Sequence, residues 1–501
     1  MSLLDKRASG ILMHISSLPD DFGIGTFGSN AYRFVDFLVR AGQTYWQILP
    51  IGPTSFGDSP YQSFSTFAGN PYFIDLKILS KQGFLKRDDF QNLDWGKNPR
   101  VVDYSLLYKN RKIVFNKLYE NFVQFIPPDF NTFCAENNFW LDDYALFMAL
   151  KDLNDSLSFY EWDDLLKKRR KSELEKYKKT CADKILYHKM LQYFFFKQWN
   201  ELKTYANKNG IKIIGDLPIY VSSDSADVWS NPNLFYLNED LIPIEVAGCP
   251  PDTFSTKGQL WGNPVYDWNF MKKSEYAWWK KRIFMGLKFY DVIRIDHFRG
   301  LDSYYAIPYG SEDATNGKWK KGPGIDFINS LKKDLGELPL IAEDLGFLTL
   351  SVKRLLKQSD FMGMKVLQFA FDSKDGEEYL PFNYSKNTVV YTGTHDNNTL
   401  KGWIDSCYHS CVDYACNFFR IQDKAKLAEE MMICALSSVS NICILTIQDL
   451  IGLGSEARMN TPSVVGGNWT WRATTEEMDS ISETKLKYFT ELYGRKSTEH
   501  I

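Results

Sequence analysis

The sequence predicts an α/β protein built on a (β/α)8 barrel, a closed ring of eight parallel strands with helices around it. Short apolar runs alternate with amphipathic helical stretches through most of the 501 residues, a pattern typical of parallel α/β folds. Eight of these runs have the composition of strands. Three of them lead into a carboxylate, and parallel barrels gather their functional side chains at the carboxyl ends of strands. We therefore expect residues 1–501 to form a single catalytic barrel with insertions.

The first predicted strand covers residues 10–14, and a helix over residues 30–41 follows it. Phe34 and Leu38 belong to an apolar set that recurs at helical spacing in this helix. We expect Ser29 to cap its start and Gly42 to end it. The other seven strands are predicted at residues 45–49, 212–215, 292–295, 340–342, 365–369, 388–391 and 442–447, with helices among them at residues 351–357 and 427–439.

Two long insertions interrupt the alternation of strands and helices. Residues 84–208 are rich in helix formers, and the apolar residues between 140 and 148 repeat at helical spacing. We expect 84–208 to form a helical subdomain inserted after the second strand. Residues 231–263 follow the third strand and are expected to be a substrate-binding loop, because Pro250 and Pro251 exclude regular helix there.

Composition excludes several classes of function. The net charge is −3, so no basic surface for nucleic acid is expected. No run of about 18 apolar residues is present, so no membrane span is expected. The aromatic content of 16% allows for both a large core and platforms on which sugar rings stack.

The cysteines point to a cytoplasmic enzyme without a metal. The eight cysteines are scattered through mostly apolar or helical segments, which favours reduced thiols over a disulfide framework. The first residues also lack the apolar run of a signal peptide. Cys407, Cys411 and Cys416 lie near His409, but their spacing fits one side of a helix better than a closed zinc site. We expect no metal and no organic cofactor.

Three predicted strands lead into the acidic residues Asp296, Glu343 and Asp396. A carboxylate at the end of a buried strand is costly unless it has a partner or a function. Any one of the three alone would be best explained as a buried ion pair or a helix cap. Three in an ordered series of strands favour one shared acidic site, and paired carboxylates are the groups that cleave glycosidic bonds.

The neighbours of each carboxylate indicate different roles. Arg294 and Asp296 are two residues apart on a strand, so they share a face, and the guanidinium is expected to keep Asp296 ionised as a nucleophile. Glu343 follows an apolar run that should raise its pKa, as a general acid requires. Asp344 should point to the opposite face and is less suited to that role. Asp396 could stabilise positive charge that develops at the anomeric carbon.

Several further segments complete a recognisable pattern. They are residues 10–19 (GILMHISSLP), 46–50 (WQILP), 59–62 (SPYQ), 215–221 (GDLPIYV), 250–252 (PPD) and 259–264 (QLWGNP). With the three acidic strand ends, these segments make the chain resemble the amylomaltases. These are 4-alpha-glucanotransferases, also called disproportionating enzymes, of the wider α-amylase superfamily. The resemblance runs from Gly10 almost to the C-terminus.

The resemblance implies a role for each matching residue. Asp296 would be the nucleophile, Glu343 the acid/base and Asp396 the transition-state stabiliser. Residues implied to surround the cleaved sugar are Asp216, Arg294, His297 and His395. Residues implied to hold neighbouring glucose units or the acceptor are Tyr61, Asp252, Gln259 and Trp261. Asn468, next to Trp469 in a glycine-rich loop, could border the cleft, although a structural turn explains it equally well.

The implied reaction is transfer of part of an α-1,4-glucan to the 4-hydroxyl of an acceptor glucan, with retention at the anomeric carbon. An α-glucan hydrolase of the amylase type is the alternative, because it needs the same carboxylates. Loops that bind an acceptor and exclude water would decide between them, and residues 231–263 are the expected ones. A catalytically inactive glucan-binding protein is disfavoured, because binding alone does not need an acid/base pair.

Overall fold

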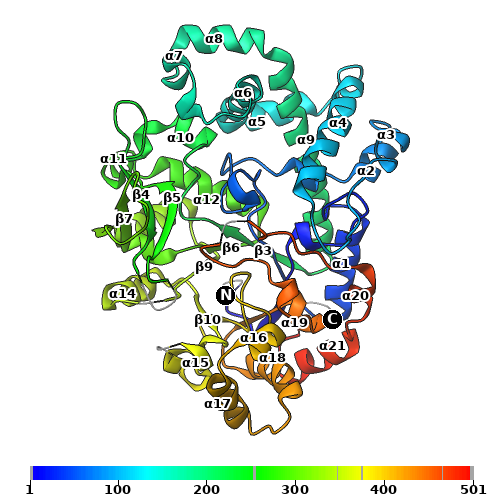
Figure 1. Cartoon of the computed structure of the whole chain (residues 1–501), viewed down its shortest axis with the longest axis vertical. Coiled ribbons are helices and arrows are strands. Elements are labelled where there is room, and N and C mark those ends of the chain that lie inside the picture. The colour runs from blue at the N-terminus through cyan, green and yellow to red at the C-terminus, as the bar shows by residue number, and fades with distance from the viewer. Residues whose placement is uncertain (1–3, 252–254, 347, 374–375, 465, 497–501) are drawn as a thin grey trace.

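The computed structural model describes residues 4–251, 255–346, 348–373, 376–464 and 466–496. Within them, eight parallel strands pair in the order β10-β11-β12-β1-β2-β3-β6-β9. A parallel bridge between Ile341 and Met362, just before β10, joins the two edges, so the sheet is nearly closed into a barrel (Figure 1). The predicted fold class is confirmed. The strands are β1 (Ala8–Leu12), β2 (Tyr45–Gln47), β3 (Lys212–Leu217), β6 (Val292–Ile295), β9 (Leu340–Ala342), β10 (Gly363–Val366), β11 (Thr388–Tyr391) and β12 (Ile442–Thr446).

Strand positions follow the apolar runs with small shifts. The first strand begins at Ala8, two positions before the predicted start, because it pairs with β12 from there onward. The sixth barrel strand along the chain, β10, ends at Val366, whereas the predicted strand ran to residue 369. Phe369 instead begins the short helix α15 (Phe369–Asp372), in which its ring packs edge-on against Tyr379.

The first helix, α1 (Ser29–Arg40), corrects the predicted cap. Ser29 is the first helical residue, and Gly28 occupies the capping position without a side-chain hydrogen bond. A Cβ on Gly28 would lie 2.0 Å from the carboxylate of Asp75, so no serine fits there. The helix ends as predicted: Gly42 has φ of +71°, a conformation that glycine adopts without strain.

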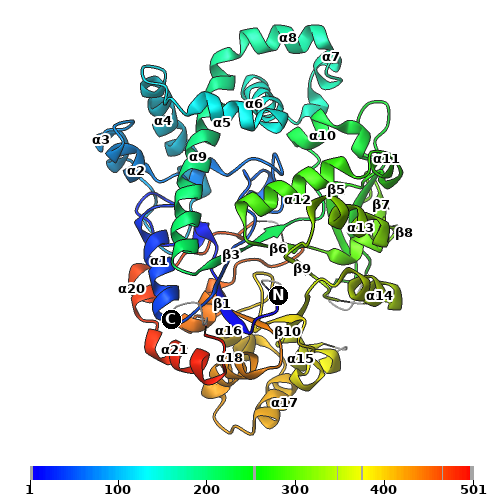
Figure 2. The same cartoon turned by 180° about the vertical axis from the view of Figure 1, so that it is seen from behind.

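Most of the remaining helices pack around the barrel or extend from it (Figure 2). The predicted helices at 351–357 and 427–439 are found as α14 and α18. Among the described residues, no helix combines the length and the apolar character that crossing a bilayer requires. Besides α1 and α15, the helices outside the segment between β2 and β3 in the described residues are α10 (Ala226–Ser230), α11 (Trp268–Lys273), α12 (Ala277–Phe289), α13 (Gly324–Leu335), α14 (Leu350–Ser359), α16 (Leu400–Ser406), α17 (His409–Phe419), α18 (Leu427–Ser437), α19 (Ile447–Ile451), α20 (Thr475–Asp479) and α21 (Glu483–Leu492).

The segment between β2 and β3 is helical. Its helices gather at the top of Figure 1, and α9 (Ala182–Lys208) runs from them back to the barrel in both views. We propose that 84–208 is one inserted subdomain, as the composition predicts. The other helices of the segment are α2 (Leu76–Lys81), α3 (Asp88–Gln91), α4 (Tyr104–Phe122), α5 (Phe130–Glu136), α6 (Asn138–Leu153), α7 (Asp164–Lys167) and α8 (Lys171–Thr180).

Residues 231–263 are not loop-like throughout, so that expectation was wrong. They contain β4 (Glu245–Cys249) and most of β5 (Gln259–Pro264). These strands join β7 (Ser303–Pro308) and β8 (Lys318–Lys321) in an antiparallel sheet of order β5-β4-β7-β8. The prolines that excluded a helix lie between the strands. At Gly248 a Cβ would lie 2.1 Å from the carbonyl oxygen of Gln259, so glycine permits the close approach of β5.

Gly215 of β3 provides a test of how tightly the barrel packs beside the acidic strand ends. A Cβ at this position would lie 2.1 Å from Cγ of the buried Tyr290 ring. We predict that Gly215→Ala lowers the free energy of unfolding by about 2 kcal/mol, through overpacking, in a denaturant titration. Adding Tyr290→Leu should recover part of the loss, so the double variant costs less than the sum. Strict additivity would contradict the assigned clash.

Candidate active site

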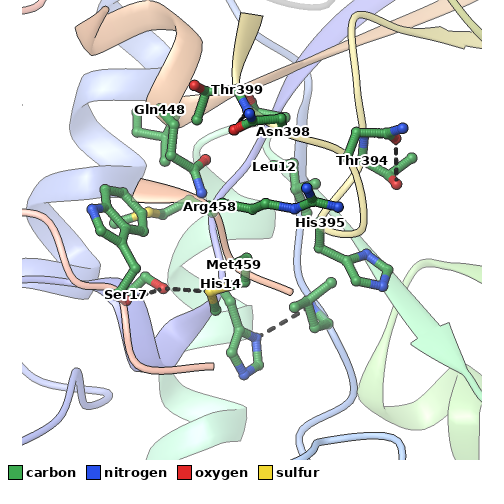
Figure 3. Close-up of a pocket in the computed structure, with 16 residues that line it drawn as sticks. Leu12, His14, Ser17, Thr394, His395, Asn398, Thr399, Gln448, Arg458 and Met459 are labelled. Atoms are coloured by element: carbon green, nitrogen blue, oxygen red, sulfur yellow. Dashed lines mark hydrogen bonds between the residues drawn. The ribbon is translucent and has the colours of Figure 1, made fainter. Parts of the chain in front are cut away.

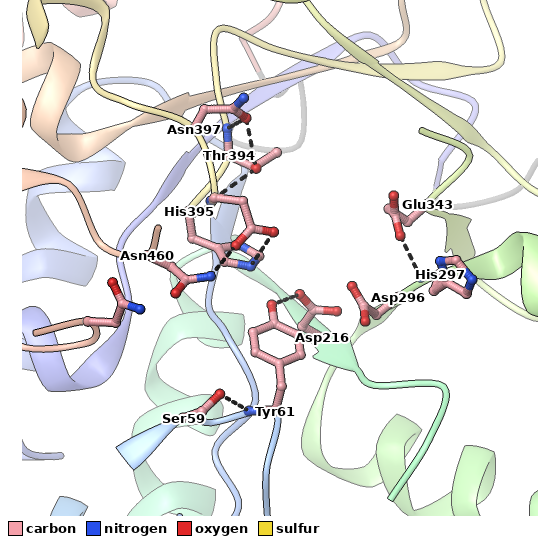
Figure 4. Close-up of polar contacts among 12 residues, drawn as sticks. Ser59, Tyr61, Asp216, Asp296, His297, Glu343, Thr394, His395, Asn397 and Asn460 are labelled. Carbon is pink, nitrogen blue, oxygen red and sulfur yellow. Dashed lines mark hydrogen bonds and ion pairs between the residues drawn. The ribbon is translucent and has the colours of Figure 1, made fainter. Parts of the chain in front are cut away.

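Four acidic side chains meet at the carboxyl ends of barrel strands. Asp216 lies at the end of β3, Asp296 follows β6, Glu343 follows β9, and Asp396 lies in the loop after β11. Figure 4 shows Asp216, Asp296 and Glu343 facing one region, with Tyr61 and His395 beside it. The structure therefore brings together the carboxylates that the strand pattern singled out.

Arg294 is the cation that holds this acidic cluster together. Strand register pairs Asp216 of β3 with Arg294 of β6. The Nη1 atom of Arg294 lies 2.5 Å from Oδ2 of Asp216 and 3.2 Å from Oδ1 of Asp296. Arg294 and Asp216 are almost fully buried, so each needs the charge of the other. Arg294 and Asp296 share a face, as predicted.

Asp296 and Glu343 differ in their affinity for a proton. Burial raises the pKa of Glu343 to about 8, Arg294 opposes this shift, and the negative charge of Asp296 reinforces it. Burial also raises the pKa of Asp296, to about 6, although Arg294 acts to lower it. Arg294 therefore offsets the burial of Asp296 only in part. Near pH 7 Glu343 is mostly protonated and Asp296 mostly ionised.

The backbone of His297 orients Glu343. His297 has φ of 51° and ψ of 49°, and its N–H donates to Oε2 of Glu343 over 2.5 Å. Burial lowers the pKa of the His297 imidazole to about 3, so the ring is neutral. Its Nε2 has no hydrogen-bond partner among the described residues. Asp344 points away, as predicted, and accepts a 2.6 Å hydrogen bond from the backbone N–H of Met364.

Aromatic rings line the site beside Asp216. The Tyr61 hydroxyl donates to Oδ2 of Asp216 over 2.8 Å. The Tyr61 ring stacks on His395, with centroids 5.2 Å apart, and Trp469 packs against both rings. Burial lowers the pKa of His395, which favours a neutral ring here as well. The arrangement leaves aromatic faces and neutral imidazoles around the acidic cluster.

Asp396 is held by residues that sequence reasoning missed. Asn460 Nδ2 donates to Oδ1 of Asp396 over 2.6 Å, and Nε2 of His395 lies 3.3 Å from Oδ2. Arg458 donates to the backbone oxygens of Asp396 and Asn460 over 2.6 and 2.8 Å. No spacing rule links Asp396 to residues 458–460, because these come from the chain after β12. The only signal in the sequence was a basic and an amide residue in the segment that follows the last predicted strand.

Gln259 and Trp261 lie on β5, which places Trp261 beside His297. The Trp261 ring packs edge-on against His297 with centroids 4.8 Å apart, and its Nε1 donates to Oε1 of Gln259 over 3.0 Å. Gln62 donates to Oδ1 of Asn263 over 3.1 Å and so ties this strand to the loop that carries Tyr61. Asp252, predicted to share their role, lies outside the described residues.

The side-chain amide of Asn468 makes hydrogen bonds within its own loop. Its Oδ1 accepts from the backbone N–H of Thr461, and its Nδ2 donates to the carbonyl oxygens of Thr461 and Val464. These contacts favour the structural-turn explanation. Its neighbour Trp469 is the residue whose ring reaches Tyr61 and His395.

A small pocket adjoins the site (Figure 3). The ends of β1, β11 and β12 form it, and it shares His395 and Arg458 with the surroundings of Asp396. Burial lowers the pKa of His14 in this pocket to about 3, and its Nδ1 accepts from the backbone N–H of Leu49. No group of three or more His, Cys, Asp or Glu side chains in the described ranges could hold a metal ion.

Comparisons with known proteins agree on one family. A family model described as 4-alpha-glucanotransferase (glycoside hydrolase 77) matches residues 13–477. A 4-alpha-glucanotransferase of Clostridium butyricum is 48% identical over 485 residues, covering 96% of this chain and 100% of that one. One of Streptococcus pneumoniae is 48% identical over 499 residues, covering 98% of each. The structure of amylomaltase from Streptococcus agalactiae in complex with acarbose matches with a TM-score of 0.96 and 44% identity, covering 98% of this chain and 100% of that one.

The raised pKa of Glu343 predicts a pH-dependent stability. A group whose folded pKa exceeds its unfolded value stabilises the fold at low pH, and this stability is lost as pH rises toward the folded pKa. We predict that Glu343→Gln gains stability relative to the wild type between about pH 5 and pH 8, by at most about 1.4 kcal/mol per pH unit. Thermal or denaturant unfolding of both proteins across this range is the measurement. A difference that does not change with pH would contradict the shift.

Proposed function

Because the chain belongs to the 4-alpha-glucanotransferase family, we propose that it transfers part of an α-1,4-glucan to the 4-hydroxyl of an acceptor glucan or glucose. The observation that supports this most directly is that Asp296 lies 3.2 Å from the buried Arg294. Burial raises the pKa of Glu343, to about 8, above that of Asp296, about 6. A retaining reaction needs an ionised nucleophile and a protonated acid at its start, and this order of pKa values favours those two states.

In the first half of the reaction, Asp296 attacks the anomeric carbon of the glucan while Glu343 protonates the glycosidic oxygen. The bond between the anomeric carbon and that oxygen breaks, and the reducing-end fragment leaves with the proton. A β-linked glycosyl ester on Asp296 remains. Asp396, fixed by Asn460 and Arg458, would stabilise the positive charge that develops at the anomeric carbon.

In the second half, Glu343 is ionised and acts as a base. It removes the proton of an acceptor 4-hydroxyl, whose oxygen attacks the anomeric carbon and displaces Asp296. Two inversions give net retention. The neutral rings of His297 and His395 would hydrogen-bond sugar hydroxyls without adding charge, and Tyr61 would support the sugar from the side of Asp216.

Transfer and hydrolysis differ only in what reaches the ester on Asp296. We propose that Trp261 and Gln259 of β5, with Asp252 nearby in sequence, bind the acceptor, and that the 231–263 segment limits the access of water. Trp261 supports this assignment, since its ring packs on His297 next to Glu343. We further propose a cytoplasmic enzyme that acts on maltooligosaccharides and needs no metal or organic cofactor, since acid/base and nucleophilic groups suffice for each step.

The two carboxyl groups predict a bell-shaped pH dependence of kcat/KM. Asp296 must be ionised, so activity should fall as pH drops below about 6; Glu343 must be protonated, so activity should fall as pH rises above about 8. Initial rates of glucose release from maltotriose between pH 4.5 and 9.5 would measure both limbs. In Glu343→Asp the alkaline limb should move, because that limb belongs to the acid. An unchanged alkaline limb would contradict the assignment.

Incubation of the purified protein with maltotriose tests the function itself. We predict glucose together with maltooligosaccharides longer than maltotriose, without a rise in total reducing ends. Asp296→Asn should lower this activity by about three orders of magnitude or more while the thermal unfolding profile stays cooperative. Asp413→Asn, at an exposed ion pair with Lys424, is the matched control and should retain full activity.

Other outcomes of that incubation would contradict the proposal. Maltose and glucose alone, with reducing ends rising, would mean hydrolysis. Substantial transfer by Asp296→Asn would remove Asp296 from the role of nucleophile. Measurable sugar binding without turnover of maltotriose or of longer glucans would favour a binding protein.

A further inference from the structure

The turn that follows helix α6 of the insertion is fixed by one buried lysine. The ammonium of Lys151, whose side chain is 5% exposed, donates to the carbonyl oxygens of Ser156 and Leu157, each over 2.9 Å. It also lies 2.6 Å from Oδ2 of Asp224, in the chain that leaves the barrel after β3. A charge buried to this degree requires all three oxygen partners.

The same turn makes two further hydrogen bonds to the segment after β3. The backbone N–H of Phe159 donates to Oδ1 of Asp224 over 3.1 Å. The Tyr160 hydroxyl donates to the carbonyl oxygen of Ser223 over 3.0 Å. Lys151 therefore helps to order residues 156–160. The Phe159 N–H and the Tyr160 hydroxyl, which contact residues 224 and 223, belong to this ordered turn.

Residues 221–223 in turn hold strand β5 beside the active site. The Ser223 hydroxyl donates to the carbonyl oxygen of Gly262 over 2.5 Å, directly after Trp261. Asn263 Nδ2 donates to the carbonyl oxygen of Val221 over 2.8 Å. Gly262 has φ of +76°, and a Cβ built on it would meet no atom within 4 Å, so no side chain holds this point in place. The hydrogen bond from Ser223 to Gly262, together with one from Gln62 to the Trp261 carbonyl oxygen over 3.4 Å, restrains the backbone here.

We propose that Lys151 and Ser223 are positioning residues for acceptor use: they connect the helical insertion to the backbone that presents Trp261. This inference rests on the proposed function, because it takes Trp261 as part of the acceptor side. The connection runs in series, from Lys151 through Asp224 and the Tyr160–Ser223 contact to Gly262. Neither residue belongs to the acidic cluster or to the aromatic rings that line the site beside Asp216.

A serial connection has a specific kinetic consequence. Attack of Asp296 on the donor depends on Arg294 and on the barrel strands, which this network does not contact through any hydrogen bond described above. Delivery of an acceptor hydroxyl depends on the placement of the Trp261 backbone, and displacements of about 1 Å are enough to slow an oriented reaction substantially. Loosening the network should therefore impair acceptor use while leaving formation of the glycosyl ester largely intact.

The test compares Lys151→Met, Ser223→Ala and the double variant with the wild type. Methionine keeps the buried stem of Lys151 without its charge, and alanine removes only the Ser223 hydroxyl. Fluoride release from α-maltotriosyl fluoride, measured in the first turnover, reports ester formation without a sugar leaving group. The KM for glucose as acceptor and the fraction of donor that goes to water report acceptor use. Lys176→Met removes an exposed lysine, paired with Glu173, from the same insertion and is the control.

We expect each single variant to raise the acceptor KM about five- to tenfold, and to raise the fraction hydrolysed, with fluoride release from saturating donor within about twofold of wild type. The double variant should be no worse than the more impaired single variant, because serial links are not additive. Lys176→Met should match the wild type. Should Lys151→Met fail to fold, Ser223→Ala, judged on its own acceptor KM, still decides the proposal.

Three results would overturn the inference. They are an unchanged acceptor KM in Ser223→Ala, an equal loss of fluoride release and acceptor use in both variants, and additive effects in the double variant. Each of these presupposes a wild type that disproportionates maltotriose. A wild type that only hydrolyses maltotriose would instead contradict the proposed function, and the two failures are thus distinguishable.

Discussion

The buried guanidinium of Arg294 is the interaction on which the site depends. It joins Asp216 of β3 to Asp296 at the end of β6, two strands that lie side by side in the barrel. Without this cation, burial would drive both carboxyl groups to their neutral forms. With it, the pKa of Asp296 is held to about 6, while Glu343, which has no such direct partner in the described contacts, has a pKa of about 8. One arginine thus separates the roles of two neighbouring acids, and the barrel register puts it in place.

The local pattern was sufficient to predict the barrel and the acidic strand ends. Asp296, Glu343 and Arg294 each lie within or directly after an apolar run, so strand periodicity alone places them. Asn460 and Arg458 could not be predicted this way. Asn460 is 64 residues from Asp396 in sequence, and the parallel pairing of β11 with β12 brings the chain after β12 against the loop after β11. Contacts between loops of neighbouring strands carry no periodic signal.

The segment between β3 and β6 shows a second limit of sequence reasoning. Pro250 and Pro251 correctly excluded helix, but the segment around them is a connection between two paired strands and not one long loop. Residues 245–249 pair with β5, the next strand in the chain, but also with β7, which follows β6, so the four-stranded sheet requires a contact between distant segments. Likewise, the capping position of α1 is Gly28 and not Ser29. The Asp75 carboxylate lies so close to Gly28 that a side chain would not fit there. In each case a tertiary contact outweighed a correct local preference.

Under the proposed function, the barrel fixes the donor chemistry and the surrounding segments add the acceptor side. The central claim is that Asp296 forms the covalent intermediate. The most direct test is to treat Glu343→Gln with α-maltotriosyl fluoride, whose leaving group needs no acid, and to map the product by peptide mass spectrometry. Lacking a base, the variant should accumulate a maltotriosyl ester on the peptide that contains Asp296. A label on the peptide that contains Asp216 or Asp396, or release of fluoride without any labelled peptide, would contradict the account.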